Sequence, residues 1–365
     1  MTTDPPPPVE VFVPHVGWLA FPRGDHVGVY LQQGWFERQE LTFLARYLRP
    51  ADRVVDCGAH VGLYSMLASR LIGPGGRVLA LEPNPPTYAL LCGNITANGA
   101  DNVEARAVAF GPETGSHRMS AAAGEHAAYS SLVIDTPEGR AIDVPVVRGD
   151  RLVPEVLGLG RVAFFKIDVE GYELEVWRGC RSCVDRVDVV MVECTRDNLE
   201  PRGLKPADVF HAWEDDGFRF HRYDARANRL EPLDAPDDVE WENYFATRDA
   251  ERVQRRLDTA SAPQERVARE IEARGRCAFE LLKRACDAEH LLGLARADVE
   301  RLSGELASAM DGANAHAREI AGLSESLRRA SDRVAQLEPL AIWARDARSA
   351  RLLARLGRLP VLPAE

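Results

Sequence analysis

Acidic residues follow two predicted strands of this chain, at positions where carboxylates can take part in chemistry. Asp168 and Glu170 come directly after a strongly apolar run, and Glu193 follows a second apolar run. Because the carboxyl ends of parallel strands meet at one edge of a sheet, we expect these side chains to converge. A carboxylate there can accept the proton of a reacting hydroxyl group. Asp168 is the first candidate for this role, and Lys166 is expected to pair with one of the acids.

The same acids allow other interpretations. Asp168 and Glu170 could instead cap the helix that is predicted to begin near Gly171. Asp168 together with Glu193 could hold a magnesium ion, which prefers oxygen ligands. The sequence identifies no third ligand, so we expect no metal site.

Three histidines are further candidates for a base. His60 lies in a glycine-bearing turn, His211 in a helix predicted over 206–216, and His126 in a polar loop beside Tyr129. Histidines in such positions are more often packed or surface residues than bases. Of the three, His126 is the best placed to contact an acceptor.

A cofactor site is predicted where a buried strand over 53–57 runs into a turn and then a helix. Asp56 lies in the strand. Gly58, Ala59 and Gly62 lie in the turn. A nucleotide-type site opens in this way at the carboxyl end of the first strand of a doubly wound α/β sheet.

The turn favours S-adenosylmethionine over a dinucleotide. A dinucleotide fingerprint requires a glycine at the position of His60, and Asp56 would repel a pyrophosphate. S-adenosylmethionine has no phosphate and carries a cationic sulfonium group. Glu82 ends the next predicted strand, where an acid can accept hydrogen bonds from both hydroxyls of a ribose.

Four motifs together carry a family resemblance. They are Val55-Asp56-x-Gly58-Ala59-x-x-Gly62, Leu81-Glu82-Pro83-Asn84-Pro85, Asn94-x-x-x-Asn98 and Lys166-Ile167-Asp168-Val169-Glu170-Gly171-x-Glu173. With these motifs the chain resembles the FkbM family of S-adenosylmethionine-dependent methyltransferases over about residues 50–250. The resemblance implies a Rossmann-like class I methyltransferase sheet and methyl transfer to hydroxyl groups of sugars or of polyketide-type natural products.

The site residues predicted from sequence fall into two groups. The cofactor-binding candidates are Asp56, Gly58, Ala59, Gly62, Glu82, Pro83 and Asn84. The catalytic candidates are Asp168, Glu170, Glu193 and Lys166.

The predicted elements define an α/β protein with four segments. These are a lead-in and cap segment (1–50), the methyltransferase domain (51–250), a helical linker and coiled coil (251–338) and a basic amphipathic helix (339–365). Strands alternate with helices in the domain, so we expect a largely parallel sheet with an antiparallel edge. The predicted strands are 9–13, 27–31, 53–57, 77–81, 103–110, 142–147, 161–167, 187–192, 218–223 and 241–247. Pro145 indicates that 142–147 is an edge strand, and a helix over 37–48 could cover the cofactor site.

Apolar residues fall at the core positions of a heptad repeat from Leu292 to Leu337, with His316 as the one polar exception. This pattern predicts a long C-terminal α-helical coiled coil and a homo-oligomer, although a long helix folded back on the domain would show the same pattern. Residues 342–359 combine Trp343 with regularly spaced arginines and leucines. Such a helix is typical of membrane-surface contact or of packing on the coil.

Composition sets the broad class. The 365 residues have a formal net charge of −11, which argues against a nucleic-acid partner. Of the seven cysteines, Cys180 and Cys183 come closest to a metal-ligand spacing, but no second pair accompanies them. Neither a secretory signal nor a membrane-spanning run is found. We therefore expect a cytoplasmic protein, peripheral on the inner face of the membrane if its last helix binds lipids.

The function predicted from sequence is S-adenosylmethionine-dependent O-methylation of a sugar or glycan hydroxyl. A polyketide-type acceptor is the first alternative. A non-catalytic scaffold with a methyltransferase-like fold, assembled by its coiled coil, is the second.

Overall fold

The computed structural model describes residues 7–33, 36–122, 130–133, 140–233, 241–274, 293, 295–303 and 324–335. The chain divides into two compact units, Met1–Gly275 and Arg276–Glu365. The first unit contains the sheet and the candidate site.

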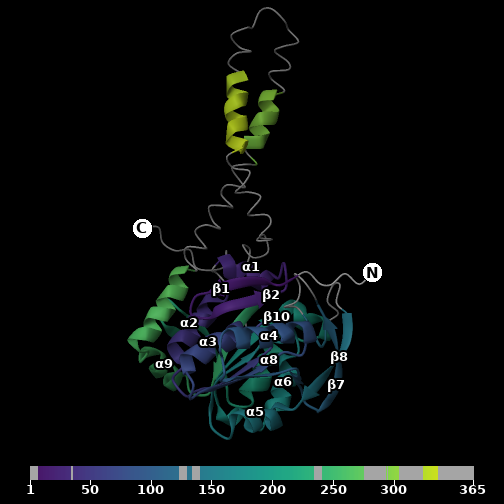
Figure 1. Ribbon diagram of the computed structural model, residues 1–365, viewed down its shortest axis with the longest axis vertical. Helices are drawn as coiled ribbons and strands as arrows, with labels where there is room; N and C mark the ends of the chain where they lie inside the picture. The colour runs from purple at the N-terminus through teal and green to yellow at the C-terminus, as the bar shows by residue number, and fades with distance from the viewer. Residues whose placement is uncertain are drawn as a thin grey trace, which may run out of the picture. The chain divides into compact units, whose positions relative to one another are not determined.

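An eight-stranded sheet forms the centre of the first unit (Figure 1). Its strands are β3 (Arg53–Cys57), β4 (Arg77–Leu81), β5 (Val103–Arg106), β9 (Val162–Ile167), β10 (Val187–Thr195), β11 (Arg219–Asp224), β12 (Arg229–Leu233) and β13 (Trp241–Thr247). Their order in space is β12-β11-β13-β10-β9-β3-β4-β5. The strands from β10 to β5 are parallel, whereas β13, β11 and β12 pair antiparallel. The predicted mixed sheet is confirmed, and its order reverses between β3 and β9, where ligands bind in such folds.

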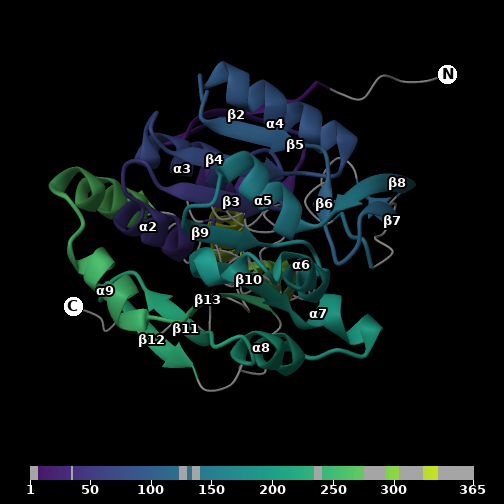
Figure 2. The ribbon, with the colours of Figure 1, turned by 90° about the horizontal axis from the view of Figure 1, so that it is seen from below.

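Helices cover both faces of this sheet (Figure 2). The helices of the first face are α2 (Arg38–Tyr47), α3 (Leu63–Ile72), α4 (Pro85–Ala97) and α9 (Ala250–Asp258). The helices of the second face are α5 (Gly149–Leu157), α6 (Glu173–Cys180), α7 (Arg196–Leu199) and α8 (Pro206–Glu214). Neighbouring strand residues alternate between the two cores: Val54 joins the first and Val55 the second.

The N-terminal residues form a hairpin and a helix that belong to the first face. Strands β1 (Val9–Val13) and β2 (Gly17–Phe21) pair antiparallel, and α1 (His26–Gln33) follows. The predicted strand over 27–31 is therefore wrong. Its valines and tyrosine favour a strand, but Asp25 Oδ1 accepts the Gly28 N–H at 3.1 Å and begins a helix, which buries Leu31.

A small second sheet has the order β6 (Ala109–Phe110), β8 (Arg140–Val147), β7 (Gly115–Ala121). The single strand predicted over 103–110 is thus two strands that lie in different sheets. The edge position predicted for 142–147 is also wrong, because β8 is the middle strand. Strand β6 pairs only with Val146 and Val147, so the ladder on that side begins just after Pro145 and does not need its missing N–H.

The first unit continues beyond the sheet. Val253 and Leu257 of α9 are buried, and so is Ala268 of the helix over 262–274. Arg46 Nε donates to Glu265 Oε1 at 3.0 Å and joins this helix to α2. A boundary at residue 250 would divide this packed unit, which extends to Gly275.

The second unit is described over two helical stretches, 295–303 and 324–335. Their predicted heptad core positions are buried or half-buried: Ala295, Val299, Leu302, Leu327, Ala330 and Val334. The coiled coil itself stays a prediction, and the basic helix over 342–359 lies outside the described residues. Among the described residues, no helix is both long and apolar enough to cross a membrane.

Candidate active site

The turn after β3 brings two strand ends into contact. Gly58 has a φ of 80° and Gly62 a φ of 97°, values that favour glycine. A Cβ atom on Gly58 would lie 1.8 Å from the carbonyl oxygen of Asp168. Glycine is therefore required for the end of β3 to approach the end of β9. The Ala59 N–H donates to the Leu81 carbonyl at 2.8 Å, which ties the turn to β4.

Glu82 holds this turn in place. Its Oε2 accepts the His60 N–H and its Oε1 accepts the Asn84 N–H, each at 2.9 Å. Burial raises the pKa of Glu82, although both backbone hydrogen bonds oppose the shift. The predicted contact with a ribose stays a prediction, and the structure adds a role in shaping the turn.

Asn84 offers a buried acceptor beside the turn. Its Nδ2 donates to Ser130 Oγ at 3.1 Å, while its Oδ1 is buried without a hydrogen-bond partner among the described residues. A polar ligand such as S-adenosylmethionine can satisfy such an atom. The preceding residue, Pro83, is half-buried.

Asp56 lies beneath the turn and is 1% exposed. Ser65 Oγ donates to its Oδ2 at 2.6 Å, and its Oδ1 lies 3.8 Å from Lys166 Nζ. Through its contacts with α3 and β9, this carboxylate helps to hold the cofactor turn in place.

Lys166 is the cation at the centre of the site. Its Nζ lies 2.9 Å from Asp168 Oδ2 and donates to the Gly58 carbonyl at 2.9 Å. The predicted pairing of Lys166 with an acid is thus confirmed. Burial lowers the pKa of Lys166, but the charges of Asp168 and Asp56 outweigh burial and raise it. Lys166 therefore stays charged and joins β3 to β9.

Three predicted catalytic acids meet at the carboxyl ends of β9 and β10. One carboxylate oxygen from each of Asp168, Glu170 and Glu193 lies within 4.8 Å of the others. Burial and the charge of Asp168 raise the pKa of Glu170 to about 8, although Asn198 Nδ2 donates to its Oε2 at 2.7 Å. Sequence reasoning found no third ligand beside Asp168 and Glu193. Glu170, whose φ of 54° lies in the left-handed region, is the third acid of this group.

The alternative role of Asp168 and Glu170 as helix caps is not what the structure shows. Helix α6 begins at Glu173, two residues later than predicted, and has no side-chain cap. Glu173 itself accepts the Gly171 N–H at 3.0 Å, and burial raises its pKa to about 7. The loop is thus held by Glu173, and Asp168 contacts Lys166 instead.

Two residues of the site were missed by sequence reasoning. Glu37 precedes α2, and Asn243 lies in β13 directly opposite Glu193. Asn243 Nδ2 donates to Glu37 Oε1 at 3.4 Å. Burial, followed by the charges of Glu40 and Asp168, raises the pKa of Glu37 to about 8. The only sequence signal was that a helix over 37–48 could cover the cofactor site.

The N-terminal hairpin is fastened to the cofactor turn by Asn94 of α4. Asn94 Oδ1 accepts the Ala20 N–H at 2.8 Å, and its Nδ2 donates to the Val61 carbonyl at 2.9 Å. Asn98 Nδ2 similarly donates to the Trp18 carbonyl at 2.7 Å. The Asn94-x-x-x-Asn98 motif thus positions the segment that covers the turn.

The histidines differ in their relation to the site. His60 Nε2 lies 3.5 Å from Asp25 Oδ2. Burial lowers the pKa of His60, but Asp25 and Glu82 outweigh burial and raise it. His211 is exposed on α8, and His126 lies outside the described residues.

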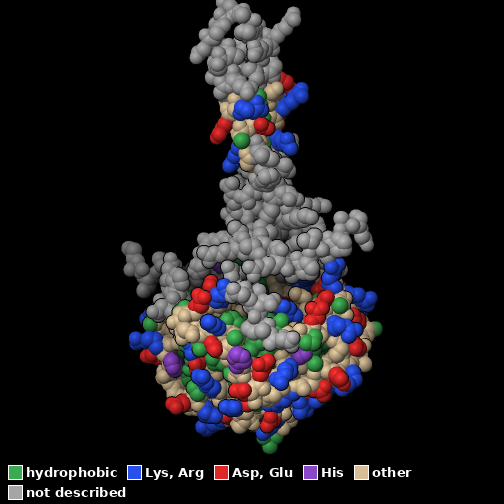
Figure 3. Space-filling model, turned by 180° about the vertical axis from the view of Figure 1, so that it is seen from behind, with side chains coloured by type: hydrophobic (Ala, Val, Ile, Leu, Met, Phe, Trp, Pro, Cys, Tyr) green, Lys and Arg blue, Asp and Glu red, His purple; other side chains and the backbone are tan. Residues whose placement is uncertain are grey.

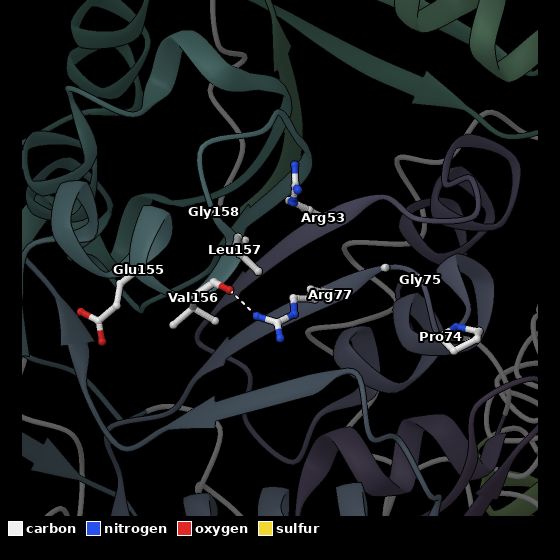
Figure 4. A pocket seen from close by; sticks show the side chains of 9 residues that line it. Arg53, Pro74, Gly75, Arg77, Glu155, Val156, Leu157 and Gly158 are labelled. Atoms are coloured by element: carbon white, nitrogen blue, oxygen red, sulfur yellow. Dashed lines mark hydrogen bonds between the residues drawn. The ribbon is translucent and has the colours of Figure 1, made fainter.

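A pocket at the other edge of the sheet is separate from these residues. It is lined by Arg53, Gly76, Arg77 and Val156 among others, and Arg77 Nη1 donates to the Val156 carbonyl at 2.8 Å (Figure 4). Arg53 and Arg77 begin β3 and β4. Because each residue of a strand adds about 3.3 Å, this pocket lies roughly 13 Å from the carboxyl ends that form the site.

Comparison with known proteins agrees with this geometry. Residues 56–223 match the family model described as the methyltransferase FkbM domain. The hexuronic acid methyltransferase AglP of Haloferax volcanii is 28% identical over 173 residues, covering 47% of this chain and 66% of that protein. The 31-O-demethyl-FK506 methyltransferase FkbM of Streptomyces tacrolimicus is 31% identical over 159 residues, covering 36% of this chain and 60% of that protein.

A third relative matches over a shorter stretch. The ribosomal RNA large subunit methyltransferase E of Sorangium cellulosum is 39% identical over 70 residues, which is 19% of this chain and 33% of that protein. The chain thus spans between one third and about two thirds of the length of these curated relatives. Residues 56–223 thus resemble the methyltransferase domain of the FkbM family, and S-adenosylmethionine is the cofactor of such a domain.

Proposed function

We propose that this protein is an O-methyltransferase that methylates a hydroxyl group of a sugar or glycan. One observation carries the proposal: the backbone of Asp168 packs against Gly58, so the carboxylate cluster lies next to the cofactor turn. S-adenosylmethionine supplies an activated methyl group. The chain must then orient an acceptor hydroxyl in line with it and accept its proton.

Different acids can orient the acceptor hydroxyl and accept its proton. Lys166 holds Asp168, and we expect this carboxylate to receive a hydrogen bond from the acceptor hydroxyl. Glu170 and Glu37 have pKa values of about 8, near the range in which a general base works best at neutral pH. Glu37 can take the proton as the methyl group is transferred, because it does not belong to the carboxylate cluster.

A sugar fits these acids better than a polyketide. Carboxylates accept hydrogen bonds, and a sugar presents several neighbouring hydroxyl donors. Three carboxylates within 4.8 Å can bind such a set together, whereas an isolated hydroxyl on an apolar ring would leave the others without a donor. The test includes both acceptor classes, because AglP is named for a hexuronic acid and FkbM for FK506.

The face of the protein shown in Figure 3 does not favour an RNA acceptor. On the face shown in Figure 3, basic and acidic side chains of the described residues are interspersed. An RNA-binding face would concentrate lysines and arginines.

The test is methyl transfer from labelled S-adenosylmethionine to neutral hexoses, a hexuronic acid and a polyketide macrolide. We expect label on a neutral sugar hydroxyl, with less transfer by Asp168→Asn than by the matched control Asp224→Asn. Label on the macrolide alone would overturn the choice of a sugar. A thermal shift with S-adenosylhomocysteine addresses the scaffold alternative, because a ligand at 100 times its Kd stabilises the fold by about 2.7 kcal/mol. No shift at saturation would favour the scaffold.

We further infer that residues 292–337 assemble the protein into an oligomer. The support is the heptad repeat of the sequence, in which Leu327 and Val334 fall at one core position while Arg328 and Arg333 lie outside the seam. Light scattering should show a smaller species for Leu327→Asp with Val334→Asp. The control, Arg328→Asp with Arg333→Asp, should keep the size of the wild type. Equal sizes for all three proteins would contradict the inference.

A further inference from the structure

We propose that Asp168, Glu170 and Glu193 bind a hard divalent cation of the magnesium type, with Oδ1 of Asn243 as a fourth ligand. One carboxylate oxygen from each acid lies within 4.8 Å of the others. Three carboxylates this close repel one another, and a cation between them reverses that repulsion. Oxygen donors are the ligands that magnesium, calcium and manganese prefer.

Asn243 supplies an observation that is independent of the acids. The residue is 5% exposed, and its Oδ1 is buried without a hydrogen-bond partner among the described residues. Asn243 lies directly opposite Glu193 in the antiparallel pair of β13 with β10, so both side chains are on the same face of the sheet. Its Nδ2 donates to Glu37, which leaves the amide oxygen for the cluster. A cation would satisfy this buried acceptor, and amide oxygens are common ligands of such ions.

The spacing fits a single ion. Ligand bonds of about 2.1 Å for magnesium and 2.3–2.6 Å for calcium place opposite ligands about 4.2–5.2 Å apart. The 4.8 Å that contains all three carboxylate oxygens lies in this range. Lys166 Nζ contacts Asp168 through Oδ2, so we assign Oδ1 of that carboxylate to the ion.

One side of the proposed ion is accessible to an acceptor. The side chain of Asp168 is 23% exposed, whereas Glu193 and Asn243 are buried. An ion held on one side by the buried ligands can bind an acceptor hydroxyl on its accessible side and favour loss of the hydroxyl proton. This role rests on the proposed function, whereas the binding of the ion does not.

The test measures ion binding to the full chain without cofactor or acceptor. After chelation and removal of the chelator, Mg²⁺ is titrated by calorimetry and Mn²⁺ by electron paramagnetic resonance. We expect one site per chain. Glu193→Gln and Asn243→Leu should each raise the Kd by at least about 10- to 100-fold, the range found when even outer-shell partners are removed. Glu155→Gln, which removes an exposed carboxylate of α5, is the matched control and should bind like the wild type.

Melting curves in chelator show whether the buried variants fold. If they do not, Glu170→Gln at a partly exposed position gives the same comparison. The proposal is overturned if neither ion binds at millimolar concentration, or if the folded ligand variants bind as tightly as Glu155→Gln. Methyl transfer is measured separately. An ion bound at these residues in a protein that methylates no sugar contradicts the proposed function alone, and sugar methylation by a protein that binds no ion contradicts the cation site alone.

Discussion

Replacing Glu82 with glutamine tests whether this acid shapes the cofactor turn or only contacts the cofactor. In the structure its two carboxylate oxygens accept the backbone N–H groups of His60 and Asn84. A glutamine has one oxygen and one NH₂ group, so one of these N–H groups must face another donor. The substitution therefore breaks one of the two hydrogen bonds that fix the turn.

The magnitude follows from these two contacts. A hydrogen bond to a charged group contributes about 1.5–3 kcal/mol, and a buried N–H without an acceptor costs about 1–3 kcal/mol. Part of this is offset, because burial of the charged carboxylate is itself unfavourable and raises the pKa of Glu82. We expect Glu82→Gln to lower the free energy of unfolding by about 2–3 kcal/mol.

Urea unfolding measures this change, and calorimetry with S-adenosylhomocysteine measures cofactor affinity under conditions where the variant is folded. We expect both to fall. Glu104→Gln, a partly exposed acid on the neighbouring strand β5, is the control and should stay within about 0.5 kcal/mol of the wild type. Unfolding within that same margin for Glu82→Gln would refute the assignment of this residue to the turn.

Three further predictions concern the cover, the acceptor side and the pH dependence. Asn94→Leu removes three hydrogen bonds, two to Ala20 of β2 and one to Val61 of the cofactor turn. At about 0.5–1.5 kcal/mol per bond, the free energy of unfolding in urea should fall by about 1.5–4.5 kcal/mol, and a change below about 0.5 kcal/mol would contradict this. Asp168→Asn should lower methyl transfer by about two to four decades while S-adenosylhomocysteine still binds; unchanged turnover would exclude it as the acceptor-facing acid. Burial lowers the pKa of His60, but Asp25 and Glu82 raise it above its usual value. The proton of His60 therefore stabilises the fold below the unfolded pKa of about 6.5, and this contribution is lost as the pH rises through the folded pKa. Asp25→Asn should accordingly destabilise more at about pH 6 than at about pH 9; an equal loss at both would show that His60 is not the cause.

Local patterns in the sequence were enough to place the two halves of the site. The buried strand before Gly58, the glycine turn and the following helix are encoded within about 20 neighbouring residues, and their periodicity and glycines are readable directly. The acids Asp168 and Glu193 were found because they follow apolar runs that form parallel strands. Their meeting then follows from the general rule that such strands end at the same edge.

The tertiary structure decided which distant residues complete the site. Glu37 and Asn243 are about 200 positions apart, and neither lies in a motif; they meet because α2 and β13 both pack at this edge. The same holds for the strand predicted over 27–31. Its residue types favour extended structure, but the cap from Asp25 and the burial of Leu31 select a helix. Sequence periodicity reports only neighbours along the chain, whereas these outcomes depend on contacts whose free energy arises between elements that are far apart in it.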